Sequence, residues 1–213
     1  MKKHILFFAA VILFVSSSFA QNNNYETTMA KNLELMRSGK TAEELQQAAN
    51  GFERIATAEQ KEWLPLYYAT LTYINISAKE KDESKKDQYL DKGQEHLNKA
   101  LKLVPKESEL HVLQGYVHLA RINVSPIARG MKYSGMATKA FEKAKTLNPE
   151  NPRVYFMLAN TKYNTPKMFG GGPEAAKPYL DQAKEKFDVF KPASAIAPNW
   201  GKSQTEAMLA NYN

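Results

Sequence analysis

The sequence predicts an all-α protein, a solenoid of antiparallel helix pairs. Three observations support this fold class. Nearly every segment after Tyr25 has the apolar spacing of an amphipathic helix, strand-like alternation is absent, and one helix-pair pattern returns at a fixed offset. The expected helices cover residues 25–38, 42–58, 61–78, 85–104, 107–121, 134–147, 151–164, 173–190 and 200–212.

The N-terminus has the order of regions that is typical of a secretory signal peptide. A basic start precedes an apolar run from Ile5 to Val15, and Ser18 and Ala20 stand at the −3 and −1 positions of a cleavage site. Cleavage after Ala20 predicts a periplasmic or secreted protein, and without a cysteine no lipid anchor is expected. The expected divisions are residues 1–20 as signal peptide, 21–24 as a flexible N-terminus and 25–213 as the repeat domain.

Helix-capping and helix-breaking residues separate the expected helices. Ser38-Gly39 ends the first helix, and Thr41 with Glu44 forms a capping-box pattern for the second. Pro105, Pro149 and Pro152 fall between later helices, where a missing N–H costs little. Each break therefore agrees with the helix bounds that the apolar spacing suggests.

Charge and composition limit the classes of partner. The net charge is +7 for the whole chain, but basic and acidic residues interleave, as in Lys79–Gln88. This pattern is typical of a solvated helix face and not of a nucleic-acid stripe. No stretch after the signal is apolar enough to span a membrane.

Internal repetition is the strongest signal in the chain. Leu97–Gly115 (LNKALKLVPKESELHVLQG) aligns with Phe141–Ala159 (FEKAKTLNPENPRVYFMLA) at an offset of 44 residues, so that Ala100 matches Ala144. A third copy of the helix follows at Tyr179–Phe187. Small residues at matching positions allow close helix approach.

This pattern resembles the tetratricopeptide repeat (TPR) over roughly Ala42 to Phe190. The resemblance implies a right-handed superhelix of three to four helix pairs plus a C-terminal helix. The chain departs from the family in period, because the offsets of 44 and 39 residues exceed the usual ~34. Overall it looks like the short exported TPR proteins of Gram-negative bacteria.

The glycine run FGGGPE (Phe169–Glu174) does not have the composition of a phosphate loop. It follows a helix, lacks the Lys-Ser/Thr pair, and places Pro173 where an N–H donor would be needed. It is better interpreted as a long inter-helix turn, with Asn123–Gly135 as its counterpart in the preceding repeat. Such turns could form a binding edge, or the glycines could serve only chain reversal. The candidate edge residues are Met131, Tyr133, Lys167, Met168 and Phe169.

No catalytic or metal-binding motif is present in the sequence. His96, His111 and His118 have no H-E-x-x-H spacing, there is no G-x-S-x-G elbow, and paired carboxylates sit at helix starts. We expect structural or surface roles for these histidines, no enzyme activity, no cofactor and no metal.

A concave groove is the main candidate site. By resemblance to the family, positions on the first helix of each pair line this groove, although the same spacing also fits ordinary core packing. The candidate groove residues are Leu66, Thr70, Tyr73, Val112, Tyr116, Phe156, Asn160 and Tyr163.

Two functions are compatible with this sequence. The first is a non-catalytic envelope scaffold that docks a protein or peptide in the groove or on the loop edge, with no nucleic-acid partner. The alternative is a small-ligand-binding accessory of an envelope transport system. A co-purifying polypeptide would favour the first, and a retained small molecule the second.

Overall fold

The computed structural model describes residues 24–212 and confirms the all-α class, because that range contains helices and no strands. The predicted signal peptide, residues 1–20, lies outside the described residues. Residue 24, expected to be flexible, already belongs to the first helix. That helix covers residues 24–38 and is followed by α2 (Ala42–Ala58), α3 (Leu64–Lys79), α4 (Glu83–Leu103), α5 (Ser108–Ile122), α6 (Pro126–Leu147), α7 (Pro152–Asn164), the 3-10 turn η1 (Lys167–Phe169), α8 (Pro173–Val189), α9 (Lys202–Leu209) and the 3-10 turn η2 (Ala210–Tyr212).

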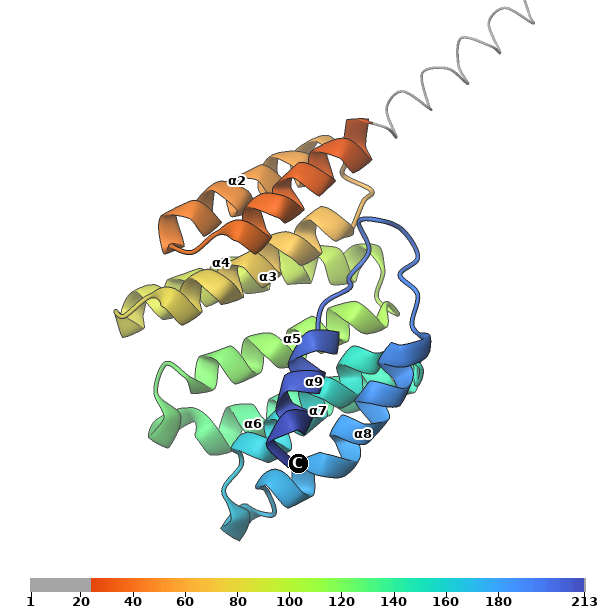
Figure 1. The fold of residues 1–213 in the computed structure, drawn as a ribbon. Helices are drawn as coiled ribbons and strands as arrows, with labels where there is room; N and C mark the ends of the chain where they lie inside the picture. Colours follow the sequence, from red (N-terminus) through yellow and green to blue (C-terminus); the bar gives the residue numbers. More distant parts are fainter. Residues whose placement is uncertain (1–23, 213) are drawn as a thin grey trace, which may run out of the picture.

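The helices stack as successive antiparallel pairs (Figure 1). The pairs are the first helix with α2, α3 with α4, α5 with α6, and α7 with α8. The first helices of the last three pairs begin at Leu64, Ser108 and Pro152, each 44 residues after the one before. The repeat predicted from the sequence is therefore a repeat of structure.

Local sequence explains most helix starts. The Thr41 hydroxyl accepts a hydrogen bond from the Glu44 N–H at 3.1 Å, and the Glu44 carboxylate accepts one from the Thr41 N–H at 3.2 Å. This is the predicted capping box. Asp82 caps α4 through its side chain, and Pro126 and Pro173 occupy first-turn positions of α6 and α8, where no N–H is needed.

The turn predicted at Asn123–Gly135 is wrong, because α6 begins at Pro126 and passes through both of its glycines. Neither Gly130 nor Gly135 has a positive φ, so each occupies an ordinary helical position at a cost of about 1 kcal/mol relative to alanine. Arg129 offsets part of this cost by donating two hydrogen bonds, at 2.7 and 2.6 Å, to Asp87 of α4.

The turn predicted between α7 and α8 is confirmed. Gly170 and Gly172 have φ values of 75° and 101°, which favour glycine. The Gly172 N–H donates to the Lys162 carbonyl at 2.9 Å and closes the turn onto the end of α7. The glycine run is thus a device for chain reversal.

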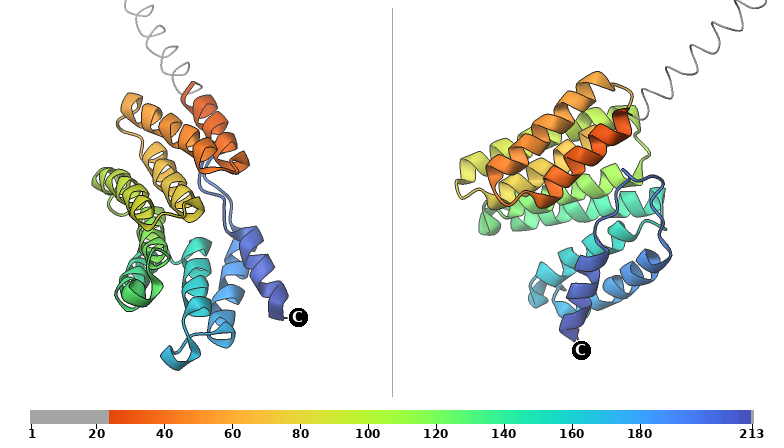
Figure 2. Two further views of the ribbon diagram at one scale, coloured as in Figure 1. Left: turned by 90° about the vertical axis from the view of Figure 1, so that its left-hand side faces the viewer. Right: turned by 45° about the horizontal axis from the view of Figure 1, so that its top comes forward.

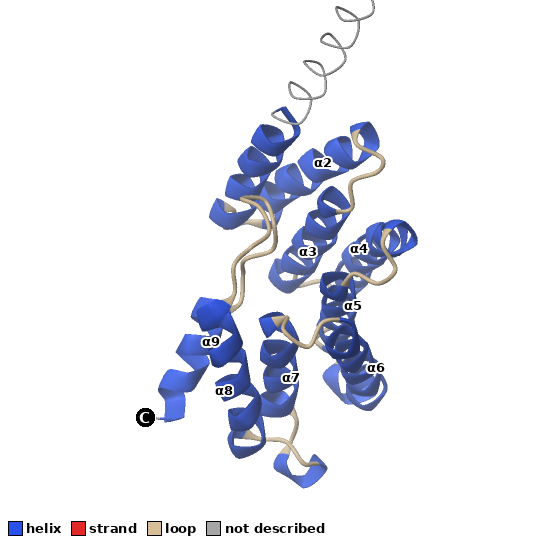
Figure 3. Cartoon of the chain, turned by 90° about the vertical axis from the view of Figure 1, so that its right-hand side faces the viewer, coloured by secondary structure: helices blue, strands red, loops and turns tan. Residues whose placement is uncertain are grey.

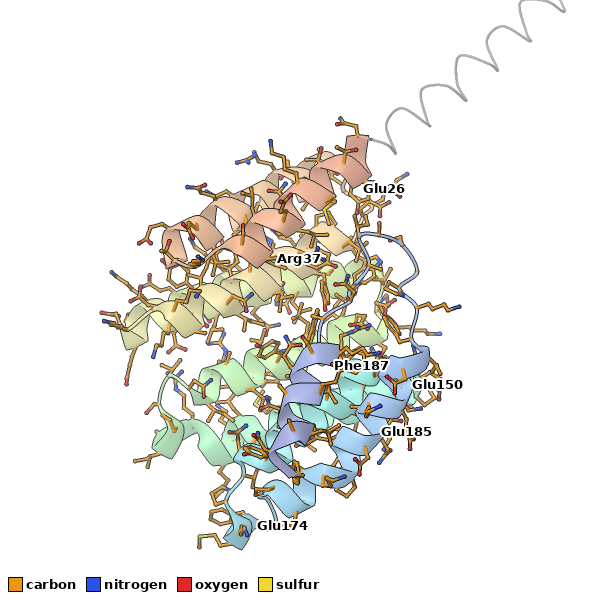
Figure 4. The ribbon with its side chains drawn as sticks, viewed as in Figure 1. Glu26, Arg37, Glu150, Glu174, Glu185 and Phe187 are labelled. Atoms are coloured by element: carbon orange, nitrogen blue, oxygen red, sulfur yellow. The ribbon has the colours of Figure 1, made fainter. Side chains whose placement is uncertain are left out.

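The segment 190–201, expected to lie between two helices except at its end residues, runs without helix along the inner side of the solenoid (Figures 2 and 3). Ile196 is buried, and its carbonyl accepts a hydrogen bond from the Tyr68 hydroxyl at 2.8 Å. The Trp200 indole N–H donates to the Tyr67 hydroxyl at 2.7 Å. Arg37 of the first helix donates to Asn199 at 3.3 Å (Figure 4). We call residues 190–201 the inner segment.

A buried ion pair fixes the inner segment to α5 and α7. Arg153 is only 1% exposed, and its guanidinium donates to the Glu109 carboxylate at 2.7–2.9 Å and to the Trp200 carbonyl at 3.3 Å. Burial acts to lower the pKa of Arg153, but the Glu109 carboxylate outweighs burial and raises that pKa. Arg153 is therefore charged and paired, and the segment it holds is part of the folded core.

Candidate functional site

A surface groove lies between α2 and α4, over α3 (Figure 1). Its volume is about 740 Å³, within the range of small-molecule sites. Figure 3 shows α4 on the side of the molecule opposite the inner segment, so the groove opens on the outer face. We call it the outer groove.

Two helix stripes form the walls of the outer groove. On α2, polar side chains recur at helical spacing at Gln46, Asn50, Glu53 and Thr57. On α4, the facing stripe is mainly basic. It consists of Lys92, Glu95, His96, Lys99 and Lys102.

Leu66 and Tyr73 of α3 form the floor of the outer groove. The Tyr73 ring lies parallel to the His96 imidazole, with 5.9 Å between centroids and 4° between planes. It also stacks on Tyr89 at 6.3 Å. Burial raises the pKa of Tyr73 to about 12, so its hydroxyl stays protonated at neutral pH.

Glu53 organises the polar centre of the groove. Its Oε1 accepts a hydrogen bond from the Tyr73 hydroxyl at 2.7 Å and lies 2.9 Å from His96 Nε2. His96 Nδ1 is buried and has no hydrogen-bond partner among the described residues. The imidazole is therefore held in place by Glu53 and by stacking, and it is not directed freely into the groove.

The lysines give the rim of the groove a positive potential. Lys92 lies 5.9 Å from the centre of the Tyr73 ring. Within residues 24–212, Lys92, Lys99 and Lys102 take part in no ion pair. Three ammonium groups at the rim, without ion-pair partners among the described residues, favour a ligand that carries carboxylates.

The predicted groove residues separate into different places. Leu66 and Tyr73 line the outer groove and not an inner one. Thr70 and Val112 are fully buried, and the Thr70 hydroxyl donates to the Gly93 carbonyl of α4 at 2.9 Å. These positions face the second helix of their pair, because the apolar stripe that packs a pair has the same spacing as a groove-lining stripe.

The remaining candidates lie nearer the inner side. Tyr116 and Phe156 pack against Trp200, with ring centroids 6.1 and 6.2 Å apart. Asn160 and Tyr163 are half-buried on α7. The inner segment thus occupies the space beside the two aromatic candidates.

The predicted edge residues are mostly exposed. Met131 and Tyr133 lie on α6, and Lys167, Met168 and Phe169 form η1. Met131 is 88% exposed, Met168 82% and Phe169 65%. Tyr133 is half-buried and its ring lies 6.0 Å from that of His118. A role in binding remains a prediction for these residues.

The polar centre and basic rim of the outer groove were not predicted from the sequence. His96 was assigned a structural or surface role, and Glu53, Lys92 and Lys99 were not singled out. A signal was present, since Lys92, His96 and Lys99 recur at i, i+4 and i+7 on one face of a helix. This spacing alone does not indicate a groove, because the groove forms only where α2 and α4 flank the same part of α3.

Two absences apply to the part of the chain that the structure describes. No helix there is both long and apolar enough to cross a bilayer. No group of three or more His, Cys, Asp or Glu side chains between residues 24 and 212 is arranged to hold a metal ion.

Comparisons with known proteins support the TPR-like fold. The chain is similar to the HusA haemophore from Porphyromonas gingivalis, with 28% identity over 88% of this chain and 92% of that one, and a TM-score of 0.79. It is also similar in fold to a thermophilic TPR protein from Thermus thermophilus, at 13% identity over 91% and 95% of the two chains and a TM-score of 0.56. No family model and no curated protein matches the sequence.

The fold and these similarities define the class of protein. The chain is a TPR-like helical-repeat protein, and its similarity to a haemophore indicates a helical scaffold that acts by interaction or binding.

Proposed function

We propose that this protein binds haem or a related porphyrin in the outer groove. The observation that carries the proposal is the similarity to a haemophore over almost the whole chain, at 28% identity and a TM-score of 0.79. This function corresponds to the second one predicted from the sequence, a small-ligand-binding accessory of an envelope transport system. The predicted signal peptide would place the protein outside the cytoplasm, where a haem carrier would act.

The outer groove has the size and chemistry that a porphyrin needs. A porphyrin is a flat apolar ring with carboxylate groups on one edge. Leu103, which is 41% exposed, offers apolar contact beside the buried Leu66 and Tyr73, while Lys92 and Lys99 can pair with the carboxylates. The volume of about 740 Å³ is large enough for such a ring.

The arrangement favours recognition of the ring and its carboxylates over ligation of a central iron. His96 Nε2 is 2.9 Å from Glu53, and the Tyr73 hydroxyl donates to the same carboxylate oxygen. Either side chain would have to leave Glu53 before it could ligate a metal. A metal-free porphyrin is therefore expected to bind about as well as haem.

Docking of a polypeptide in the concave groove, the first function predicted from the sequence, receives less support. The inner segment packs there, with Ile196 and Trp200 hydrogen-bonded to Tyr68 and Tyr67. A peptide would have to displace these contacts. The outer groove is available without any rearrangement of the fold.

Absorbance titration with haemin and with metal-free protoporphyrin IX tests the proposal. The double variant Lys92→Glu/Lys99→Glu should weaken binding of both ligands about tenfold, because it turns two attractions into two repulsions. The matched control is Lys132→Glu/Lys139→Glu, which makes the same charge change at the same seven-residue spacing on α6. This control should bind as the wild type does.

Three results would contradict the proposal. The first is that the wild type shows no saturable binding of either porphyrin. The second is an equal loss of affinity in the two double variants, and the third is no loss of affinity in either of them. Because all four lysines are exposed, both variants are expected to fold. Thermal melting by circular dichroism checks that they do.

A further inference from the structure

We propose that one edge of this protein docks on an anionic lipid surface. The edge consists of Ile127 and Met131 on the first turns of α6 together with Met168 and Phe169 on η1. The inference is independent of porphyrin binding, since the edge and the outer groove share no residue.

The four side chains of this edge project into solvent. Ile127 is fully exposed, and Met131, one helical turn later, is 88% exposed. Met168 and Phe169 follow each other on η1 and are 82% and 65% exposed. Figures 1 and 2 show the start of α6 and the α7–α8 turn, near Glu174 of Figure 4, at the same end of the molecule, one beneath the other.

Exposure of this kind is unusual for the chain. Elsewhere in the described residues, large apolar side chains are mostly buried, and the other well-exposed one, Val189, stands alone at the end of α8. Exposed apolar side chains gathered at one end of a molecule mark interaction surfaces, whereas single ones do not. We therefore expect the edge to bind a partner with an apolar surface.

The charge around the edge favours an anionic partner. Helix α6 carries five basic residues and one acid, which are Arg129, Lys132, Lys139, Lys143, Lys145 and Glu142. Lys132 and Lys139 are exposed and make no ion pair with a described residue. A surface potential of one sign extends along the helix that presents Ile127 and Met131.

The combination of side chains fits a lipid surface better than a protein. Protein interfaces are depleted of lysine in favour of tyrosine, tryptophan and arginine. Membrane-surface binding instead combines lysines with projecting Phe and aliphatic side chains, which enter the boundary between headgroups and acyl chains while the ammonium groups pair with lipid phosphates. Side chains that project this far into solvent can insert into lipid.

Vesicle co-sedimentation of the full mature protein tests this inference. Vesicles of phosphatidylcholine are compared with vesicles that also contain phosphatidylglycerol, at low and high salt. We expect binding to the anionic vesicles only, weakened by salt. The variants Ile127→Ser/Met131→Ser and Met168→Ser/Phe169→Ser should each lower the partition coefficient about tenfold, since they remove apolar contact with the acyl region.

Two controls separate the edge from the rest of the surface. Val189→Ser removes an apolar side chain that is 74% exposed at the end of α8, and Lys92→Glu/Lys99→Glu changes charge at the outer groove. Val189→Ser should leave vesicle binding unchanged, and Lys132→Glu/Lys139→Glu should reduce it more than Lys92→Glu/Lys99→Glu does.

Each alternative outcome overturns the inference. Wild-type protein that stays in the supernatant with anionic vesicles excludes a lipid role, as does binding that the edge variants and Val189→Ser weaken equally. Self-association that is lost in the edge variants, measured by light scattering without lipid, would assign the edge to a second copy of the chain. Capture of an acidic protein by the edge without vesicle binding would assign it to a protein partner.

Discussion

Gly115 lies on α5 where that helix faces the Phe141 ring of α6. A Cβ atom at Gly115 would collide with the ring, which is fully buried. Because Gly115 aligns with Ala159, the sequence predicted that two helices approach closely at this position. The structure confirms this prediction for α5 and α6. By contrast, Gly135 on α6 has open space where a Cβ would stand.

These two helical glycines give opposite predictions for the same substitution. Gly115→Ala should lower the free energy of unfolding by about 1–3 kcal/mol, because overpacking against Phe141 exceeds the gain in helix propensity. Gly135→Ala should raise it by about 0.5–1 kcal/mol, since the gain is unopposed. Urea denaturation measures both values. Equal effects of the two substitutions would show that α5 and α6 do not pack against each other as described.

At the scale of helices, the sequence predicted starts and ends well wherever they depend on neighbouring residues. Thr41 with Glu44 and Pro173 each define a helix start locally. The error at Asn123–Gly135 arose because its glycines and proline have the composition of a turn. The helix there is supported by tertiary contacts, above all those of Arg129 with Asp87, whose partners are 42 residues apart.

Asp87 therefore provides a pH-dependent test of how α6 is anchored. Its hydrogen bonds with Arg129, supported by the nearby Arg121, hold the pKa of Asp87 below its usual value of 3.8. A depressed pKa in the folded state contributes stability that is present above the unfolded pKa and is lost as the pH falls through the folded pKa. Asp87→Asn should cost about 1–2 kcal/mol near neutral pH.

The cost of Asp87→Asn should shrink as the pH falls below 3.8, because the unfolded carboxyl is protonated first and the folded one becomes neutral at its lower pKa. Denaturant titrations of both proteins at neutral and at acid pH measure the difference. A difference that stays constant over this range would mean that Asp87 does not stabilise the fold through its charge.

At the scale of the whole molecule, the position of the candidate site could not be predicted from local patterns. The repeat predicted the stacking of pairs, but the inner segment reaches the first helix and α3 through contacts such as Tyr68 with Ile196, which are 128 residues apart. Those contacts cover the side where a ligand was expected. The outer groove depends in turn on how α2 and α4 lie over α3, which no single helix pattern specifies.

The central claim is that the ligand occupies the outer groove, and amide chemical-shift mapping with metal-free protoporphyrin IX tests it most directly. A bound porphyrin ring shifts the resonances of nearby nuclei strongly. We predict that the largest shifts occur at Glu53, Thr57, His96 and Lys99, on the facing stripes of α2 and α4. Shifts concentrated at Ile196 and Trp200 of the inner segment, with α2 and α4 unchanged, would contradict the claim.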